Sequence, residues 1–461
     1  MPKYYISCGS LTVFCLLVSR SLQAQVPEAP PAAPTEQVPA APLAAPPPSP
    51  APPTAAATSP LSAASSAAVA SAPPDAAPAP VEAKPASPHW YELLKIRGYT
   101  QLRYSGFPTL KDNDKLVNDQ GDKYIGQGST FAIRRARVIL YGDVHERVSV
   151  YLQTDFASGI GDQNHVAIVR DWYFDLFLDP AKELRLRLGQ SKVPFGFENL
   201  QSSQNRLPLD RNDALNSAVK DERDLGIFAY WAPAATRKLF KSLVDDNLKG
   251  SGDYGVIGLG AYNGQTANRF DRNDNFHVIG RISYPFEIGS QILELGGGGY
   301  TGLYQVALQK QGDVEYTTPD SDLSLRDARA YGSLILYPKP LGIVVEYNAG
   351  VGPQQGKDEP TVVKTRKLRG GYAQLFLKID DLLGSVSFTP YVRGTYYDGG
   401  KKFETNAPYY EVRELEMGIE WQLLKALEVT AVYTVANRTS SKYPYAQQKG
   451  HLGRVQVQVN Y

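Results

Sequence analysis

Apolar and polar residues alternate with a period of two over many short segments between Trp90 and the C-terminus. The last segment shows this most clearly, because Val455, Val457, Val459 and Tyr461 alternate with arginine, glutamine and asparagine. Successive side chains of a β-strand point to opposite faces of its sheet, so each such segment predicts a strand with one apolar and one polar face. Sixteen strands are expected, near residues 94–106, 129–142, 146–157, 166–178, 183–193, 224–232, 253–263, 274–285, 290–304, 326–338, 341–350, 367–379, 384–397, 410–422, 425–437 and 450–461.

The connections between these segments alternate between short and long. Connections after even-numbered strands are mostly tight, such as Lys339-Pro340 and Leu423-Leu424, and those after odd-numbered strands are mostly long and polar. The period of two also fits a soluble β-sandwich, but short turns on one side and long loops on the other are typical of a membrane barrel. One connection, from Ala232 to Gly252, is long where a tight turn is expected. The pattern therefore predicts an all-β protein, a transmembrane antiparallel up-and-down β-barrel of 16 strands over residues 90–461.

The N-terminus has a different composition. Residues 1–25 have the features of a secretory signal peptide, with Lys3 before a mostly apolar stretch and a plausible cleavage site at Leu22-Gln23-Ala24. Both cysteines, Cys8 and Cys15, lie in this stretch. After cleavage the protein would contain neither a disulfide nor a thiolate metal site.

Residues 26–88 contain more than half of the 34 prolines, together with alanine and serine and almost no aromatic residues. Such a composition cannot bury a core and predicts a disordered, partly polyproline II segment. We expect it to act as a periplasmic tether, and an inert linker is the alternative.

The net charge of +1 gives the chain no overall attraction for nucleic acid. The expected barrel holds nearly equal numbers of basic and acidic residues, so any preference for anions must come from their placement. The polar faces of the strands carry the candidates. Arg185 and Arg187 alternate with three leucines, Arg393 lies on a polar face, and Arg97 shares a phase with Arg103.

The strand at 129–142 leaves its phase open. Arg135 and Arg137 share one face, and Arg134 lies on the opposite one. Only one of these faces can point into a barrel.

The third long connection, Pro194 to Arg223, is expected to fold into the lumen and narrow it, because fixed charges act strongly at a constriction. A solvated surface loop is the alternative. Its basic candidates are Arg206, Arg211, Lys220 and Arg223.

Arginines in a pore allow two interpretations. Guanidinium groups bind oxyanions bidentately, so a series of them could pass an anion from site to site. They could equally face carboxylates across the pore, which would give a transverse field without anion specificity. Acidic partners for the second arrangement are available at Asp155, Asp171, Asp175, Glu414 and Glu416.

Enzymatic motifs do not emerge. The five histidines have no metal-ligand spacing, and the glycines from Gly296 to Gly299 are not followed by the Lys-Ser or Lys-Thr of a phosphate loop. Asp112-Asn113-Asp114 and residues 271–274 lack the glycine and the glutamate of a calcium loop. We therefore expect no catalytic residues, no metal site and no cofactor, and a protein that is not an enzyme.

Three segments resemble the phosphate-selective porin O and P family. They are Phe131-Ala-Ile-Arg-Arg-Ala-Arg-Val, Tyr151-Leu-Gln-Thr-Asp-Phe and Leu188-Gly-Gln-Ser-Lys-Val-Pro-Phe-Gly-Phe-Glu, and the penultimate strand at Leu427 is also similar. The resemblance covers most of residues 95–461. It implies a trimeric sixteen-strand outer-membrane porin that passes anions, phosphate or polyphosphate in its best-known members, with selectivity in lumenal arginines and lysines. The motif match assigns such roles to Arg185, Arg187, Lys192, Arg135 and Arg137.

The near-neutral barrel and the Pro/Ala segment depart from the family pattern, so three functions remain open. They are an anion-favouring porin, a general and weakly selective porin for small solutes, and a non-transporting structural protein held by its tether. The expected location is the outer membrane of a Gram-negative bacterium. The expected partners are outer-membrane lipid, small anions, two further copies of the chain in a homotrimer, and the barrel-assembly machinery, which recognises C-terminal strands that end in an aromatic residue such as Tyr461.

Overall fold

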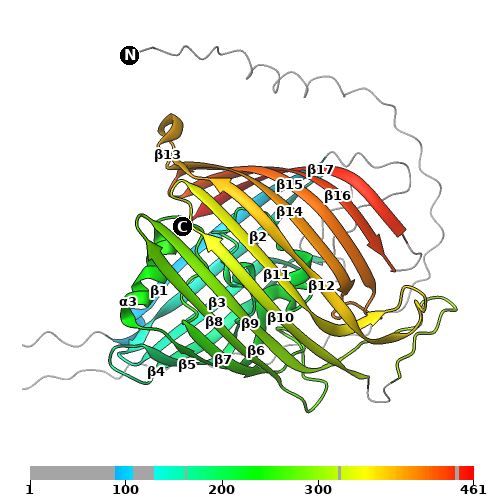
Figure 1. Ribbon diagram of the computed structural model, residues 1–461. Helices are drawn as coiled ribbons and strands as arrows, with labels where there is room; N and C mark the ends of the chain where they lie inside the picture. The colour runs from blue at the N-terminus through cyan, green and yellow to red at the C-terminus, as the bar shows by residue number, and fades with distance from the viewer. Residues whose placement is uncertain (1–88, 107–128, 161–162, 320–322, 442–445) are drawn as a thin grey trace, which may run out of the picture. The chain divides into compact units, whose positions relative to one another are not determined.

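The computed structural model describes residues 89–106, 129–160, 163–319, 323–441 and 446–461. The expected signal peptide and tether, and Asp112-Asn113-Asp114, lie outside these ranges. Within them the chain forms one antiparallel sheet that closes on itself, because the first strand pairs with both the second and the last (Figure 1). No helix among the described residues is long and apolar enough to cross a membrane.

The strands alternate in direction around the barrel. They are β1 (Lys95–Gly106), β2 (Thr130–His145), β3 (Val148–Ile160), β4 (Gln163–Phe177), β5 (Leu184–Lys192), β6 (Arg223–Trp231), β7 (Ile257–Tyr262), β8 (His277–Ile288), β9 (Gln291–Gln305), β10 (Ser324–Leu336), β11 (Leu341–Gln355), β12 (Val363–Leu377), β13 (Ile379–Asp380), β14 (Ser387–Gly400), β15 (Tyr409–Leu424), β16 (Leu427–Ser440) and β17 (Ala446–Asn460). The two-residue β13 continues β12 against the same neighbour, β14, so the wall has sixteen strands.

The helical elements are short. They are η1 (Trp90–Leu93), α1 (Phe197–Leu200), α2 (Asp213–Asn216), η2 (Lys220–Glu222), α3 (Ala234–Asp245) and η3 (Leu382–Gly384). Helices α1 and α2, with η2, belong to the connection between β5 and β6, which is the third long connection of the sequence pattern. Helix α3 lies in the connection between β6 and β7, the position where the alternation of short and long connections fails.

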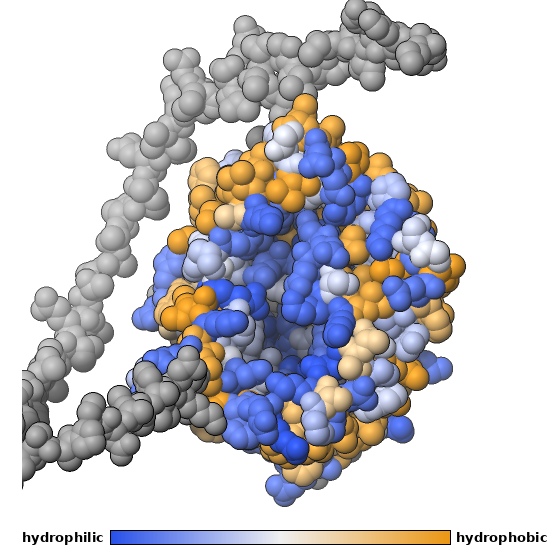
Figure 2. Space-filling view, turned by 90° about the vertical axis from the view of Figure 1, so that its left-hand side faces the viewer, coloured by the Kyte–Doolittle hydropathy of each residue, from blue (hydrophilic) through white to orange (hydrophobic). Residues whose placement is uncertain are grey.

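The strands present an apolar outer face, and over part of the barrel their inner face is polar. Along β17, Val455 and Val459 are exposed, whereas Arg454, Gln456 and Gln458 are buried. An apolar outer band and a polar interior are typical of barrels in a lipid bilayer. Figure 2 looks at the end of the barrel that lies on the left in Figure 1, and shows a hydrophilic hollow with hydrophobic residues around the outside of the wall.

A β-bulge explains the ambiguous phase of β2. The pairing with β1 passes from Gln101–Arg135 to Leu102–Ile133, so Arg134 is the extra residue. A bulge lets two consecutive residues lean toward one face. Arg134 and Arg135 therefore both have partners inside the barrel, which strict alternation does not allow.

The sequence prediction of the wall is confirmed. Each of the sixteen predicted segments overlaps one strand of the barrel, with ends that differ by a few residues. The short turns gather at one end of the barrel, which we call the turn end. The longer connections gather at the other end, which we call the loop end.

Candidate functional site

The connection between β5 and β6, residues 193–222, packs inside the barrel rather than over its rim. Its backbone N–H groups at Phe197 and Glu198 donate to the Glu346 carboxylate of β11, at 2.6 and 3.1 Å. Arg329 of β10 donates to Ser217 Oγ at 2.8 Å. Contacts of this kind with the inner faces of several strands hold the connection across the lumen.

One half of the interior is filled by an apolar core. Inward aromatic side chains of β6 to β12 meet the β5–β6 connection and α3, and Phe195 packs edge-on against Tyr300 and Tyr331 with ring centres 5.0 and 4.9 Å apart. Phe240 and Leu243 of α3 join the same cluster. We call this side, lined by β6 to β12, the packed half.

The other half, lined by β14 to β17 and β1 to β5, is charged. Three guanidinium groups converge on one carboxylate of the connection, that of Asp210. Its oxygens lie 3.0 Å from Arg103, 3.5 Å from Arg134 and 2.5 Å from Arg454. Burial would raise the pKa of the Asp210 carboxyl, but Arg103 and Arg454 hold it well below its usual value.

Two more arginines lie near this cluster with neutral acceptors. Arg135 donates to Gln101 Oε1 at 2.8 Å, and Arg206 donates to the carbonyls of Pro208 and Leu209. Among the described residues, no carboxylate forms an ion pair with either arginine. Five arginines therefore lie around Asp210, and one of them, Arg454, also contacts the Glu416 carboxylate at 3.2 Å.

Elsewhere in the charged half, arginines and carboxylates occur in pairs. Arg187 forms a two-pronged bond with Asp175, at 2.8 and 2.9 Å, and Tyr173 lies under the same guanidinium. Pairs of the same kind join Arg137 to Asp155 at 2.9 Å, Arg223 to Asp171 at 2.8 Å and Arg393 to Glu198 at 2.8 Å. Such pairs set a local field but leave little net charge.

A cavity of about 300 Å³ lies between this wall and the segments folded into the barrel. Its lining includes four basic and two acidic side chains, together with tyrosines. These charged residues are Arg97, Arg187, Lys192, Arg223, Asp171 and Asp253.

The remaining predicted candidates also lie at the lumen. Arg185 contacts Asp253 at 3.1 Å, Lys192 contacts Glu222 at 2.9 Å, and Arg211 pairs with the same glutamate. Arg97 is half-buried with its guanidinium over the Tyr141 ring, and Lys220 is half-buried in η2. The geometry thus brings most of the predicted arginines to the charged half, where their role in conduction stays a prediction.

Several lumenal basic residues were missed by the sequence analysis. Arg454 and Arg438 are buried on the inner faces of β17 and β16. The alternation in the last strand places Arg454 on a polar face, although it was not named as a candidate, and Arg438 lies one residue beyond the predicted strand 425–437. Lys249 would not have been found, because its position follows from the path of the β6–β7 connection and not from a strand.

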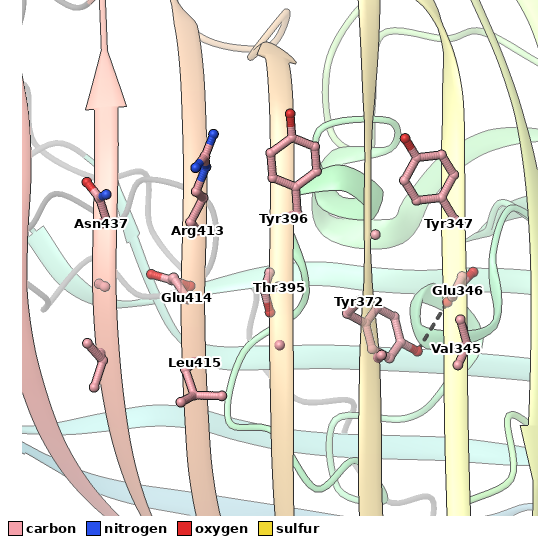
Figure 3. Close-up of a pocket in the computed structure, with 15 residues that line it drawn as sticks. Val345, Glu346, Tyr347, Tyr372, Thr395, Tyr396, Arg413, Glu414, Leu415 and Asn437 are labelled. Atoms are coloured by element: carbon pink, nitrogen blue, oxygen red, sulfur yellow. Dashed lines mark hydrogen bonds between the residues drawn. The ribbon is translucent and has the colours of Figure 1, made fainter.

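A second hollow, of about 670 Å³, lies on the outer face of the wall (Figure 3). It crosses β11 to β16 at glycine and alanine positions, between larger residues such as Val345 and Leu415. The Tyr372 hydroxyl donates to Glu346 at 3.2 Å on the inner side of the same wall. This hollow is therefore separate from the lumenal site.

In the part of the chain that the structure describes, no three histidine or carboxylate side chains lie close enough together to bind a metal ion.

The closed barrel, its apolar outer band and its charged interior define the protein as an outer-membrane β-barrel channel. Residues 113–461 match the family described as phosphate-selective porin O and P. The chain belongs to this family and is an outer-membrane porin. The family and the fold indicate a channel rather than an enzyme.

Comparisons with individual proteins add distant similarities. No curated protein sequence matches the chain. Among solved structures, the outer membrane channel DcaP of Acinetobacter baumannii is 12% identical, with a TM-score of 0.49, over 80% of this chain and 97% of that one. OmpT of Vibrio cholerae in its trimer form is 10% identical, with a TM-score of 0.47, over 80% and 99%. An anion-selective porin from Comamonas acidovorans is 11% identical, with a TM-score of 0.46, over 80% and 99%.

Proposed function

We propose that this porin is a passive diffusion channel that favours small anions, with phosphate or polyphosphate as candidate solutes. The observation that carries the proposal is the convergence of Arg103, Arg134 and Arg454 on the single carboxylate of Asp210. Arg135 and Arg206 add positive charge beside it. An entering anion would meet more guanidinium groups than carboxylates, in a confined space where charges act strongly.

In this proposal the β5–β6 connection is the constriction. It crosses the lumen, packs against the packed half and leaves solutes a narrowed route along the charged half. The two-pronged geometry of guanidinium groups suits the oxygens of phosphate.

A general, weakly selective porin is the second candidate. The ion pairs of Arg187 with Asp175, Arg137 with Asp155 and Arg223 with Asp171 favour it, because each pair cancels its own charge. The two candidates differ in which part of the lumen controls permeation.

We also propose the remaining arrangement of the protein. Residues 1–25 direct export, residues 26–88 form a tether in the periplasm, and the turn end of the barrel faces that compartment. Three copies form the working unit, and the C-terminal strand with Tyr461 is the recognition element for barrel assembly.

The reversal potential of single channels in a planar bilayer under a salt gradient tests the functional proposal. Anion preference, with chloride current blocked by added phosphate, is the expected result. A cation-preferring or indifferent pore would support the general porin, and properly folded protein without conductance would overturn both.

A further inference from the structure

The connection between β6 and β7, residues 232–256, enters the barrel from the turn end. After α3 the chain reverses, because the Leu243 carbonyl accepts from both Leu248 and Gly250 N–H groups. Gly250 has no room for a side chain, since a Cβ there would lie 2.8 Å from that of Leu243. Gly255 has a φ of +73° and would place a Cβ 2.6 Å from the Ile257 carbonyl oxygen. Glycine is therefore required at both ends of this short loop, because a side chain at either position would clash with its neighbours.

This loop and the residues before it reach both sides of the lumen. Lys249 bonds to Glu420 of β15 at 2.5 Å. Asp253 bonds to Arg185 of β5 at 3.1 Å, and Arg281 of β8 donates to the carbonyl of Tyr254 at 2.8 Å. Because β5 and β15 are well separated around the wall, the chain between these contacts crosses the interior.

The loop also binds the β5–β6 connection directly. The amide of Gln201 donates to the Lys249 carbonyl at 2.6 Å, and that of Asn205 donates to the Gly250 carbonyl at 2.8 Å. All four of these residues are buried. The two connections, which enter from opposite ends, therefore meet inside the barrel.

The loop lines the cavity described above. Residues 251–254 line the 300 Å³ cavity together with Arg97 and Arg187. Asp253 supplies one of the two carboxylates in the cavity lining. It also bonds to Arg185, and to Arg237 at 2.8 Å. Burial would raise the pKa of Asp253, but Arg185 and Arg237 keep it below its usual value.

We propose that residues 249–255 are a second, turn-end element of the pore, and that Asp253 sets its charge preference there. This proposal rests on the proposed function in that it takes the lumen to conduct. It does not depend on which ion is preferred. Solutes would pass between this loop and the wall of β1 to β5, where the Asp253 carboxylate offsets the surrounding arginines.

The test is the reversal potential of Asp253→Asn against the unaltered porin under the same salt gradient. Loss of one negative charge within about 8 Å of the path predicts a chloride-to-potassium permeability ratio roughly twofold higher. Asp245→Asn is the matched control, because Asp245 lies in the same connection with an exposed side chain that pairs only with Lys241 among the described residues. We expect no shift from this control.

A second variant keeps the test decisive if Asp253→Asn fails to fold. Ser251→Cys places a thiol in the cavity lining, and the natural cysteines, Cys8 and Cys15, are confined to the N-terminus. A charged methanethiosulfonate reagent should reduce the current of this variant and leave that of the parent porin unchanged. An unreactive Ser251→Cys, or a folded Asp253→Asn with the parent reversal potential, would overturn the proposal. If the parent pore proves indifferent or cation-preferring, only the proposed anion preference fails.

Discussion

The packed half and the charged half of the barrel interior face the same β5–β6 connection but bind it in different ways. On the packed half, Phe195 and Phe197 are buried against Tyr300 of β9, Tyr331 of β10 and Tyr337, the residue after β10. On the charged half, Asp210 and Glu198 are held by arginines of β1, β14 and β17. Apolar contacts exclude water and fix position. The charged residues are also buried, with 1% exposure for Arg103 and 9% for Asp210, and a fixed charge in a confined pore acts strongly on a passing ion. In our proposal, one side anchors the connection and the other forms the route.

The largest expected effect comes from a change in the packed half, which in our account anchors the β5–β6 connection. Phe195→Ala removes a ring that touches both Tyr300 and Tyr331, and a buried Phe-to-Ala change costs about 3–5 kcal/mol of unfolding free energy. We expect a lower urea midpoint for the folded barrel in detergent and a noisier, larger single-channel conductance. Phe270→Ala is the control, because Phe270 is 94% exposed. A quiet, unchanged channel in Phe195→Ala would contradict the anchoring role of the packed half.

The next effect concerns the charged half. Asp210→Asn leaves Arg103, Arg134 and Arg454 without their shared carboxylate. We expect the chloride-to-potassium permeability ratio to rise roughly twofold or more, as for one charge removed at about 8 Å in water. Asp313→Asn, at an exposed position of the β9–β10 connection, should leave the ratio as it is. A ratio that stays constant in Asp210→Asn would place the route elsewhere.

A smaller shift of the reversal potential is expected when an arginine that is paired with a carboxylate in the barrel wall is replaced. Arg187→Gln leaves Asp175 with the more distant Arg185, at 4.0 Å, as its partner, so the reversal potential should move toward cations by less than the Asp210 change moves it toward anions. The double variant Asp175→Asn/Arg187→Gln removes both charges, so its reversal potential should lie close to that of the parent porin. If the single and double variants behave alike, the pair does not act as a unit.

The smallest effect is expected from pH. The pKa values of Asp210 and Asp253 both lie below their usual range, so these carboxylates keep their charge as the pH falls from 7.5 to 5. Their ion pairs would be lost only at pH values below the usual carboxyl range. Reversal potentials at the two pH values should therefore agree. A reversal potential that changes with pH, with a midpoint between pH 5 and 7, would show that another titratable group controls selectivity.

The sequence predicts the wall well and the interior only in part. Strand positions follow from the period of two, which reports local geometry. It places residues such as Arg187 and Arg393 on the polar face, and both are buried inside the barrel. The bulge at Arg134 could not be predicted, because it depends on the pairing with β1. The period of two places Arg134 on the face opposite Arg135 and leaves the phase of the strand open, whereas the bulge lets both residues point into the barrel.

Contacts within the lumen escape prediction for a related reason. Asp210 meets Arg103 and Arg454, which lie far from it in the sequence, and no spacing rule connects them. The unusual length of the Ala232–Gly252 connection was visible. Its path across the barrel was not, because that path is fixed by Lys249, Asp253 and the amides of another connection.

Cysteine modification on the β5–β6 connection tests most directly whether solutes pass along the charged half. Ser202 lines the cavity on this half, and Ala218 of the same connection is buried in the packed half. Each is changed to cysteine in turn, and single-channel current is followed while a negatively charged methanethiosulfonate reagent is added. The account predicts a stable drop in current for Ser202→Cys and no reaction for Ala218→Cys. Rapid modification and block at Ala218→Cys, with Ser202→Cys unaffected, would contradict it.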